Sequence, residues 1–312
     1  MNRWTRRGLW ATTSLLTLLS LAAAAVVAGL QMAERRMNRQ IELLPSPVAL
    51  TDDGAAVERG RYLFASRGCV DCHGNDGAGR TFVDDGQGLK LAGPNISPGP
   101  GSVVKNYAAS DWVRTLRHGV KPDGRPLLVM PSEDYNRFTD GDVAALVAYV
   151  RQLAPATGGA AVLNLPLPVR VAYGFGLMPD AASKIDHRLP PAQPVPEGVT
   201  VAHGQYVANM CIGCHGAQLD GGKIAGAPPD WPAAAKLSPG EGNVMPQYAD
   251  AEALLRLFKT GQRADGSAVR VMPFESLREM SETDARALHL YLTRPDTRNA
   301  TVASQPEPTT RN

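Results

Sequence analysis

Two six-residue motifs constrain this chain more than any other feature: CVDCHG at 69–74 and CIGCHG at 211–216. All four cysteines of the 312-residue chain lie in them, each pair followed directly by a histidine. C-x-x-C-H is the attachment signature of c-type haem, because each thiol forms a thioether and the histidine binds the iron. We therefore predict two covalently attached haem c groups. The residues that would hold them are Cys69, Cys72 and His73 in the first motif and Cys211, Cys214 and His215 in the second.

Two other uses of these cysteines are open. Four cysteines in an exported chain could form two disulfides, or the thiolates and imidazoles could bind zinc. A zinc site needs four ligands in one place, whereas the two motifs lie 142 residues apart along the chain. Two complete motifs with no cysteine left over favour haem.

An internal duplication supplies the second ligand of each iron. Each motif histidine is followed 57 residues later by a methionine in a Val-Met-Pro triplet, and most matching positions differ by 141 or 142 residues. We therefore predict Met130 and Met272 as the second axial ligands, since thioether sulfur is a soft donor that raises the reduction potential. Met178 and Met245 also precede prolines but have no counterpart in the other half, so we expect them to fill core space.

The N-terminal segment predicts a membrane helix. Residues 9–30 are apolar and would extend about 33 Å as a helix, enough to cross a bilayer. Arg3, Arg6 and Arg7 precede this run, which favours a cytoplasmic N-terminus and haem domains in the periplasm. A signal peptide cleaved near 26–29 is the alternative. We expect a single uncleaved anchor in the inner (cytoplasmic) membrane.

Helix-period apolar patterns and cap residues predict the same set of helices in each half. We expect an all-α fold of two tandem class I cytochrome c-like domains after an N-terminal transmembrane helix. Gly60 and Gly204 should let the first helix of each domain cross closely over Tyr149 and Tyr291 on the last. The predicted segments are 1–34 (membrane anchor or signal), 45–154 (first domain), 155–197 (Pro-rich interdomain connector), 198–295 (second domain) and 296–312 (polar tail).

Some finer expectations concern packing. Prolines make regular helix unlikely over most of the connector, and its apolar stretch 162–178 is expected to pack across both domains. The carbonyl of Pro94, and that of Pro228 or Pro229, could accept a hydrogen bond from the free ring nitrogen of the axial histidine. The remaining histidines have no partner in the other half and are expected to be structural: His118, His187, His203 and His289.

Part of the chain also resembles a known family. GPNISPG (93–99) and SDWVRTLRHGVKPDGRPLLVMPSEDYNRFTDGDVAALVAYVRQL (110–153) resemble the cytochrome c subunits of membrane-bound bacterial alcohol, gluconate, fructose and related aldehyde dehydrogenases. The resemblance covers about 58–154 and, more loosely, 198–293. It implies a subunit that accepts electrons from a dehydrogenase catalytic subunit and passes them to ubiquinone or an oxidase. The best-known members carry three haem motifs and place their anchor last, whereas this chain has two motifs and places its apolar segment first.

These observations predict an electron-transfer subunit and not an enzyme. It would relay electrons from a partner dehydrogenase to a respiratory acceptor: quinone, an oxidase or a soluble cytochrome. Nucleic acid is excluded as a partner, because the net charge of +2 leaves no basic stripe. The alternative is a di-haem cytochrome c peroxidase, which needs one iron with an open coordination position. The symmetry of the two methionines favours the relay.

Overall fold

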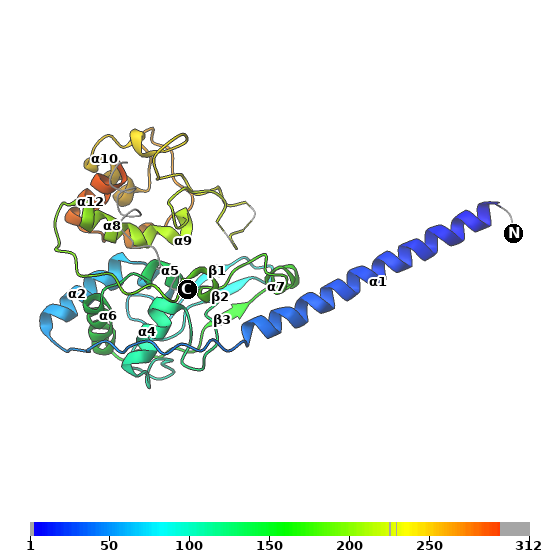
Figure 1. The fold of residues 1–312 in the computed structure, drawn as a ribbon, viewed down its shortest axis with the longest axis horizontal. Helices are drawn as coiled ribbons and strands as arrows, with labels where there is room; N and C mark the ends of the chain where they lie inside the picture. Colours follow the sequence, from blue (N-terminus) through cyan, green and yellow to red (C-terminus); the bar gives the residue numbers. More distant parts are fainter. Residues whose placement is uncertain (1–2, 225, 229, 294–312) are drawn as a thin grey trace, which may run out of the picture.

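The structure is a computed structural model that describes residues 3–224, 226–228 and 230–293; the polar tail predicted at 296–312 lies outside the described residues. Figure 1 shows a long N-terminal helix, α1 (Arg3–Met37), which projects away from two helical lobes. Among the described residues, α1 is the helix long and apolar enough to cross a membrane. An extended strap follows it and runs along the first lobe to α2 (Gly54–Ser66).

The first lobe is built on two crossing helices, α2 and α6 (Asp140–Gln152). Asp53 caps α2 by accepting a hydrogen bond from Ala55 N, and Thr139 caps α6 through Asp142 N. Their apolar faces meet in a core that includes Phe64, Trp112 and Val143. The other helices of this lobe are α3 (Cys69–His73), α4 (Ala109–His118) and α5 (Ser132–Tyr135).

The second lobe repeats this plan around its own core, which includes Leu257 and Leu288. A Cβ atom on Gly60 would lie 1.9 Å from the Ala145 carbonyl oxygen, and one on Gly204 would lie 1.9 Å from that of Ala287. The predicted close helix crossing is thus confirmed in both lobes. The elements are α8 (Val201–Ala208), η2 (Asn209–Cys211), α9 (Ile212–His215), η3 (Met245–Gln247), α10 (Ala251–Thr260), α11 (Phe274–Leu277) and α12 (Glu282–Thr293).

A small sheet departs from the all-α expectation. β1 (Thr81–Asp84), β2 (Lys90–Ala92) and β3 (Val162–Asn164) form an antiparallel sheet in that order, with Leu91 opposite Leu163. The Thr-Phe-Val run of β1 favours a strand. Gly86 and Gly88, with φ of 65° and 116°, make the turn to β2. The prediction of an all-α chain was wrong here because the third strand comes from the connector, far along the sequence.

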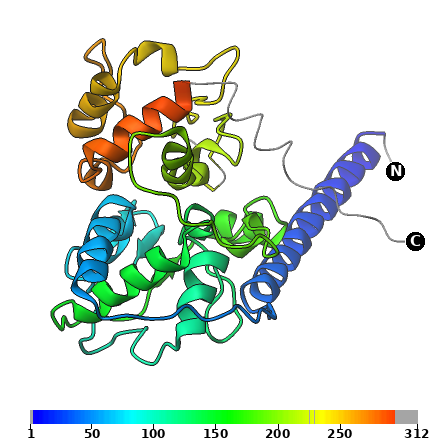
Figure 2. The same cartoon turned by 60° about the vertical axis from the view of Figure 1, so that its left-hand side comes forward.

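The connector packs mainly on the first lobe and on α1. It contains β3, the short helix η1 (Ala182–Lys184) and α7 (Leu167–Gly174), which starts after Pro166 and carries Pro168 in its first turn, where proline is tolerated. Figure 2 shows α7 beside the lower end of α1. The expectation that stretch 162–178 bridges the two lobes is therefore met only at its end, where Met178 approaches Gly226.

Candidate haem-binding sites

Each C-x-x-C-H motif forms a short helical turn that begins where the first helix of its lobe ends. In the first lobe Gly68, with φ of 86°, redirects the chain from α2 into α3, so Cys69 and Cys72 share one face. In the second lobe Cys211 ends η2, and the rest of the motif forms α9. The glycine that closes each motif has φ of 73° (Gly74) or 78° (Gly216), which explains its presence in both.

The cysteines remain available as thiols. All four lie among the described residues, and none is paired in a disulfide. Burial raises the pKa of Cys69 and Cys211 to about 12, and that of Cys72 and Cys214 to about 11, so the thiols are protonated at neutral pH. The described residues contain no group of three or more His, Cys, Asp or Glu side chains arranged to hold a metal ion. This geometry supports neither the disulfide nor the zinc alternative.

The motif histidines are oriented in the same way in both lobes. His73 Nδ1 lies 3.0 Å from the Pro94 carbonyl oxygen, and His215 Nδ1 lies 2.7 Å from that of Ala235. A carbonyl oxygen can only accept, so Nδ1 donates and Nε2 keeps the lone pair that a metal ligand needs. Burial lowers the pKa of both histidines, with the carbonyls opposing it, which favours the neutral imidazole.

The second-lobe carbonyl partner corrects one prediction. The Pro94 partner is confirmed, but the place expected for Pro228 or Pro229 is taken by Ala235, and Pro229 lies outside the described residues. Ala235 follows Pro94 by 141 residues, the same offset that relates ISPGPG (96–101) to LSPGEG (237–242). Applying this local offset would have found the residue, whereas searching for a second proline did not.

The predicted methionine ligands occupy equivalent places. Met130 and Cys69 both pack against the first core, and Met272 and Cys211 both pack against the second. Each methionine precedes a proline that starts a four-residue helix, α5 or α11. The structure therefore brings cysteine and methionine of each half around the same core. Met245 is 2% exposed within the second core, which confirms its expected packing role.

The first lobe also contains buried polar atoms that suit a porphyrin. Trp112 Nε1 and Ser102 Oγ are buried without a hydrogen-bond partner among the described residues. Both line a cavity of about 140 Å³ together with Ile96, Val104 and Tyr107. Buried donors are normally satisfied, and a propionate carboxylate would supply the acceptor. The apolar walls, the free thiols and the oriented imidazole together fit haem c.

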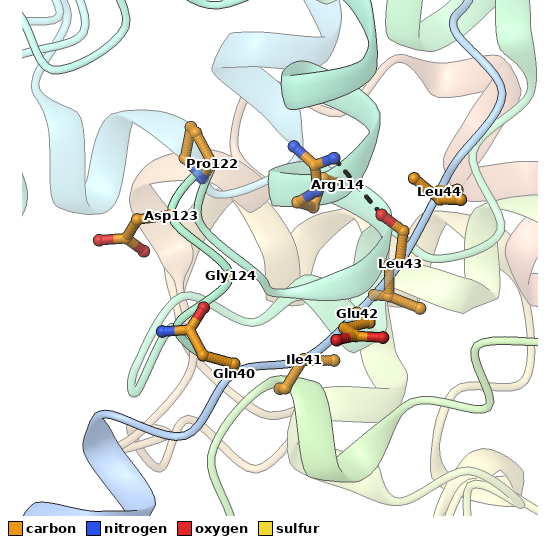
Figure 3. A pocket seen from close by; sticks show the side chains of 9 residues that line it. All are labelled: Gln40, Ile41, Glu42, Leu43, Leu44, Arg114, Pro122, Asp123 and Gly124. Atoms are coloured by element: carbon orange, nitrogen blue, oxygen red, sulfur yellow. Dashed lines mark hydrogen bonds between the residues drawn. The ribbon is translucent and has the colours of Figure 1, made fainter.

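A larger groove lies away from these residues. Figure 3 shows it between the strap at Gln40–Leu44 and the turn at Pro122–Gly124, with a volume of about 410 Å³. Arg114 donates a hydrogen bond to the Leu43 carbonyl (3.4 Å), and Ile41 N donates to the Gly124 carbonyl (2.9 Å). These contacts hold the strap on the first lobe. None of the predicted haem ligands lines the groove.

The two attachment turns contact the opposite lobe in a reciprocal manner. Gly213 N, in the second motif, donates a hydrogen bond of 2.6 Å to Asp134 in α5. Ser276 Oγ, in α11, donates one of 2.8 Å to Asp71 in the first motif. Gly213 and Asp71 hold the same motif position, and Asp134 and Ser276 each lie four residues after a predicted methionine ligand. Each attachment turn therefore meets the helix that follows the methionine of the other lobe.

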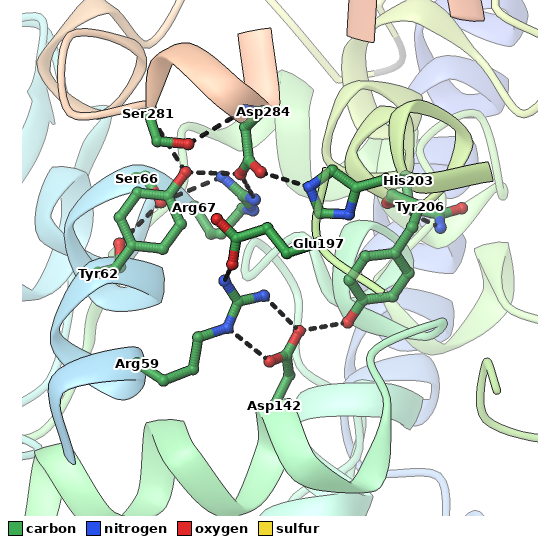
Figure 4. A network of polar contacts seen from close by, with 11 residues as sticks. Arg59, Tyr62, Ser66, Arg67, Asp142, Glu197, His203, Tyr206, Ser281 and Asp284 are labelled. Atoms are coloured by element: carbon green, nitrogen blue, oxygen red, sulfur yellow. Dashed lines mark hydrogen bonds and ion pairs between the residues drawn. The ribbon is translucent and has the colours of Figure 1, made fainter. Parts of the chain in front are cut away.

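A second reciprocal pair joins the large helices (Figure 4). Tyr62 OH donates to Asp284 (2.5 Å), and Tyr206 OH donates to Asp142 (2.6 Å), each from the first helix of one lobe to the last helix of the other. The same hydroxyls accept from Ser281 N (3.1 Å) and Thr139 N (3.2 Å), the two helix-cap residues. The lobes are thus related by an approximate two-fold arrangement.

The two acceptor carboxylates differ in their further partners. Asp142 receives Arg59 of its own lobe at 2.8 Å, and Asp284 receives His203 at 2.6 Å. His203 is therefore structural, as expected. Asp284 also pairs with Arg67 of the other lobe. Burial alone would raise the pKa of Asp284, but the Arg67 guanidinium and hydrogen bonds from Tyr62 and His203 outweigh it and lower the pKa to about 2.

The sequence predictions did not include this inter-lobe network. Its signal was present as an offset of 144 residues that relates Tyr62 to Tyr206 and Arg59 to His203. The chain between the first helix and the motif is two residues shorter in the second half, so the 142-residue offset missed these pairs.

Comparison with known proteins identifies the first lobe. Residues 55–150 match the family model described as cytochrome c oxidase, cbb3-type, subunit III. The chain is 31% identical over 134 residues to the fructose dehydrogenase cytochrome subunit of Gluconobacter japonicus, covering 41% of this chain and 27% of that protein. It is 31% identical over 183 residues to the gluconate 2-dehydrogenase cytochrome c subunit of Pantoea cypripedii (54% and 40%). It is 26% identical over 177 residues to the alcohol dehydrogenase (quinone) cytochrome c subunit of Gluconobacter oxydans (52% and 35%).

These matches span less than half of each relative's length. Residues 55–150 form a c-type cytochrome domain, and the chain is similar to the cytochrome subunits of membrane-bound dehydrogenases. A domain of this kind binds haem c covalently and transfers electrons.

Proposed function

We propose that this chain, whose first lobe is a c-type cytochrome domain, is a membrane-anchored dihaem electron relay. It would accept electrons from the catalytic subunit of a dehydrogenase and deliver them to quinone, an oxidase or another cytochrome. The relatives named above are cytochrome subunits of fructose, gluconate and alcohol dehydrogenases, which supports this class of donor. The reciprocal contacts between the two attachment turns are the observation that carries the proposal.

The second lobe is proposed to hold the second haem. Cys211 and Cys214 would form the thioethers, with His215 and Met272 as axial ligands, matching Cys69, Cys72, His73 and Met130 in the first lobe. Equivalent helices, unpaired thiols and an imidazole hydrogen-bonded to a backbone carbonyl support this assignment. The bound groups supply one-electron chemistry.

The side chains around each site have distinct tasks in this proposal. The carbonyls of Pro94 and Ala235 fix the rotation of the two imidazoles. The apolar cores exclude water from the iron face and, with methionine as ligand, favour the reduced state. Met130 and Met272 have equivalent surroundings, which supports two six-coordinate irons and gives no asymmetry of the kind a di-haem peroxidase needs.

The lobe interface would set the path between the two sites. Each attachment turn is hydrogen-bonded to the helix after the other lobe's methionine, through Gly213 with Asp134 and Ser276 with Asp71. These contacts hold the two porphyrin-bearing turns at a fixed separation. We propose that electrons pass between the lobes at this interface.

The anchor and orientation complete the proposal. Gly29 of α1 lies against α7, close enough that a Cβ on Gly174 would be 2.0 Å from the Gly29 carbonyl oxygen. Cleavage near 26–29 would remove or disrupt this packing, which supports a retained membrane helix. Arginines before the apolar run favour a cytoplasmic N-terminus, so the lobes would face the periplasm.

Haem content of the full-length protein and its variants tests the proposal. We expect two haems per chain by the pyridine haemochrome method, and one each in the double variants Cys69→Ala/Cys72→Ala and Cys211→Ala/Cys214→Ala. Coulometry should show two electrons taken up reversibly per chain, without turnover of hydrogen peroxide. One haem in the unsubstituted protein would refute the two-site assignment, and peroxide turnover would refute the relay.

A further inference from the structure

The connector exposes apolar side chains beside α1. Leu167, Phe175 and Leu177 in and after α7 are 52%, 46% and 74% exposed. In a segment surrounded by water, such a group of large apolar side chains would be unfavourable. The exposed group is continuous with α1, whose own large side chains are exposed along the apolar run.

The contact with α1 fixes the depth of α7. Gly29 and Ala33 face α7, and a Cβ on Gly174 would lie 2.0 Å from the Gly29 carbonyl oxygen and 3.0 Å from Ala33 N. Small residues four apart allow such close helix packing in membranes. Gly29 is 19 residues beyond the exposed Trp10, about 28 Å along the helix, close to the thickness of a hydrocarbon core. When α1 spans a bilayer, α7 therefore lies at its outer boundary.

Polar contacts prevent α7 from swinging away from α1. The Arg36 guanidinium lies 5.0 Å from the centre of the Tyr173 ring. Arg39 makes a bidentate ion pair with the fully buried Asp180, at 2.6 and 2.7 Å, and Tyr173 OH donates to the same carboxylate (2.9 Å). The next residue, Ala181, donates its N–H to the Leu127 carbonyl of the first lobe (3.0 Å). Helix α1, α7 and the first lobe are thus tied together.

We infer that residues 167–177 form a second membrane contact, which places Leu167, Phe175 and Leu177 at the boundary between lipid headgroups and acyl chains. This inference rests on the proposed function, since it requires that α1 is retained as the anchor. The exposed Arg35 lies just beyond the apolar run, where it can meet lipid phosphates. The contact would seat the first lobe at a fixed height and rotation on the bilayer, which a single helix and a free strap could not do.

Selective thiol labelling tests the inference in the full-length holoprotein. Leu177→Cys and the control Val199→Cys, a 52% exposed position at the far end of the connector, are placed in phosphatidylcholine–phosphatidylglycerol nanodiscs. The native cysteines are thioether-linked there, and the unsubstituted protein gives the background. Each variant is labelled with an apolar maleimide and with a sulfonated one. We expect the apolar-to-sulfonated rate ratio to be about tenfold higher at position 177 than at 199, because only the apolar reagent enters the boundary.

Two results would overturn the inference and can be told apart. Equal rate ratios at the two positions, in protein that remains with the membrane after a carbonate wash, would refute the α7 contact and leave the anchor intact. Release of the unsubstituted protein by carbonate would refute both the anchor and the contact. Haem content, measured on the same samples, reports separately on the electron-relay proposal.

Discussion

The two lobes share one backbone plan but stabilise it with different side chains. In the first, Arg59 supports the acceptor Asp142, and in the second His203 supports Asp284. The Tyr62 and Tyr206 contacts are alike, whereas Arg67 pairs with Asp284 and has no counterpart at Asn209. The approximate two-fold arrangement therefore depends on tyrosine–carboxylate hydrogen bonds, and a buried charge is added on one side. Variants at equivalent positions can separate what is shared from what is particular to each lobe.

Removing the carboxylate on the charged side should have the largest effect. Asp284→Ala leaves the buried Arg67 without a counter-ion, so we expect a loss of about 3–5 kcal/mol in the free energy of unfolding. Asp142→Ala should lose less, because its partner Arg59 remains partly exposed. Denaturant unfolding measures both. An equal loss in the two variants would show that the extra ion pair contributes nothing.

The close helix crossings should respond alike in the two lobes. Gly60→Ala and Gly204→Ala each place a methyl group 1.9 Å from a backbone oxygen, so the helices must separate. We expect about 1–3 kcal/mol of destabilisation in each, measured by thermal unfolding of the holoprotein. Gly54→Ala, at a site with open space, is the matched control and should cause no such loss. A loss confined to one lobe would contradict their equivalence.

Acid should weaken the side that holds the ion pair. The pKa of Asp284 falls from 3.8 to about 2 on folding, so the unfolded chain binds more protons between these values. A contribution of about 2 kcal/mol, fully present above pH 3.8, should be lost as pH falls towards 2. Stability measured against pH should lose this part of its slope in Asp284→Asn. An unchanged slope would show that other carboxylates cause the acid sensitivity.

The reciprocal tyrosines should show the smallest and most equal effects. Tyr62→Phe and Tyr206→Phe each remove one hydrogen bond to a carboxylate, at 2.5 and 2.6 Å. We expect a loss of about 1–2 kcal/mol in each, and a larger change in the double variant if the two contacts close one interface. A double-variant cycle in unfolding experiments measures this coupling. A large effect of one substitution and none of the other would break the two-fold description.

Local signals in the sequence were enough to predict much of each lobe. The spacing of apolar residues, the caps at Asp53 and Thr139, and the paired Gly60 and Gly204 correctly predicted the helices and their crossing. The Pro94 carbonyl was also found, because the duplication and the chemistry of histidine pointed to the same place.

Features that depend on distant contacts could not be predicted in this way. β3 has strand structure because it pairs with β2, and α7 is stable because it packs against Gly29 of α1. The contacts between lobes, such as Tyr62 with Asp284, join residues far apart in the chain that share no local pattern. Small changes of offset between the halves also hid Ala235 and Tyr206 from a single alignment register.

The near-infrared absorbance of the oxidised full-length protein tests the central claim most directly. Methionine bound to ferric haem gives a weak charge-transfer band, and two equivalent lobes should give two equivalents of it per chain. Met130→Ala and Met272→Ala should each remove half of the band and lower one reduction potential. A single equivalent in the unsubstituted protein, or a full band that persists in Met272→Ala, would contradict the account of two matching haem lobes.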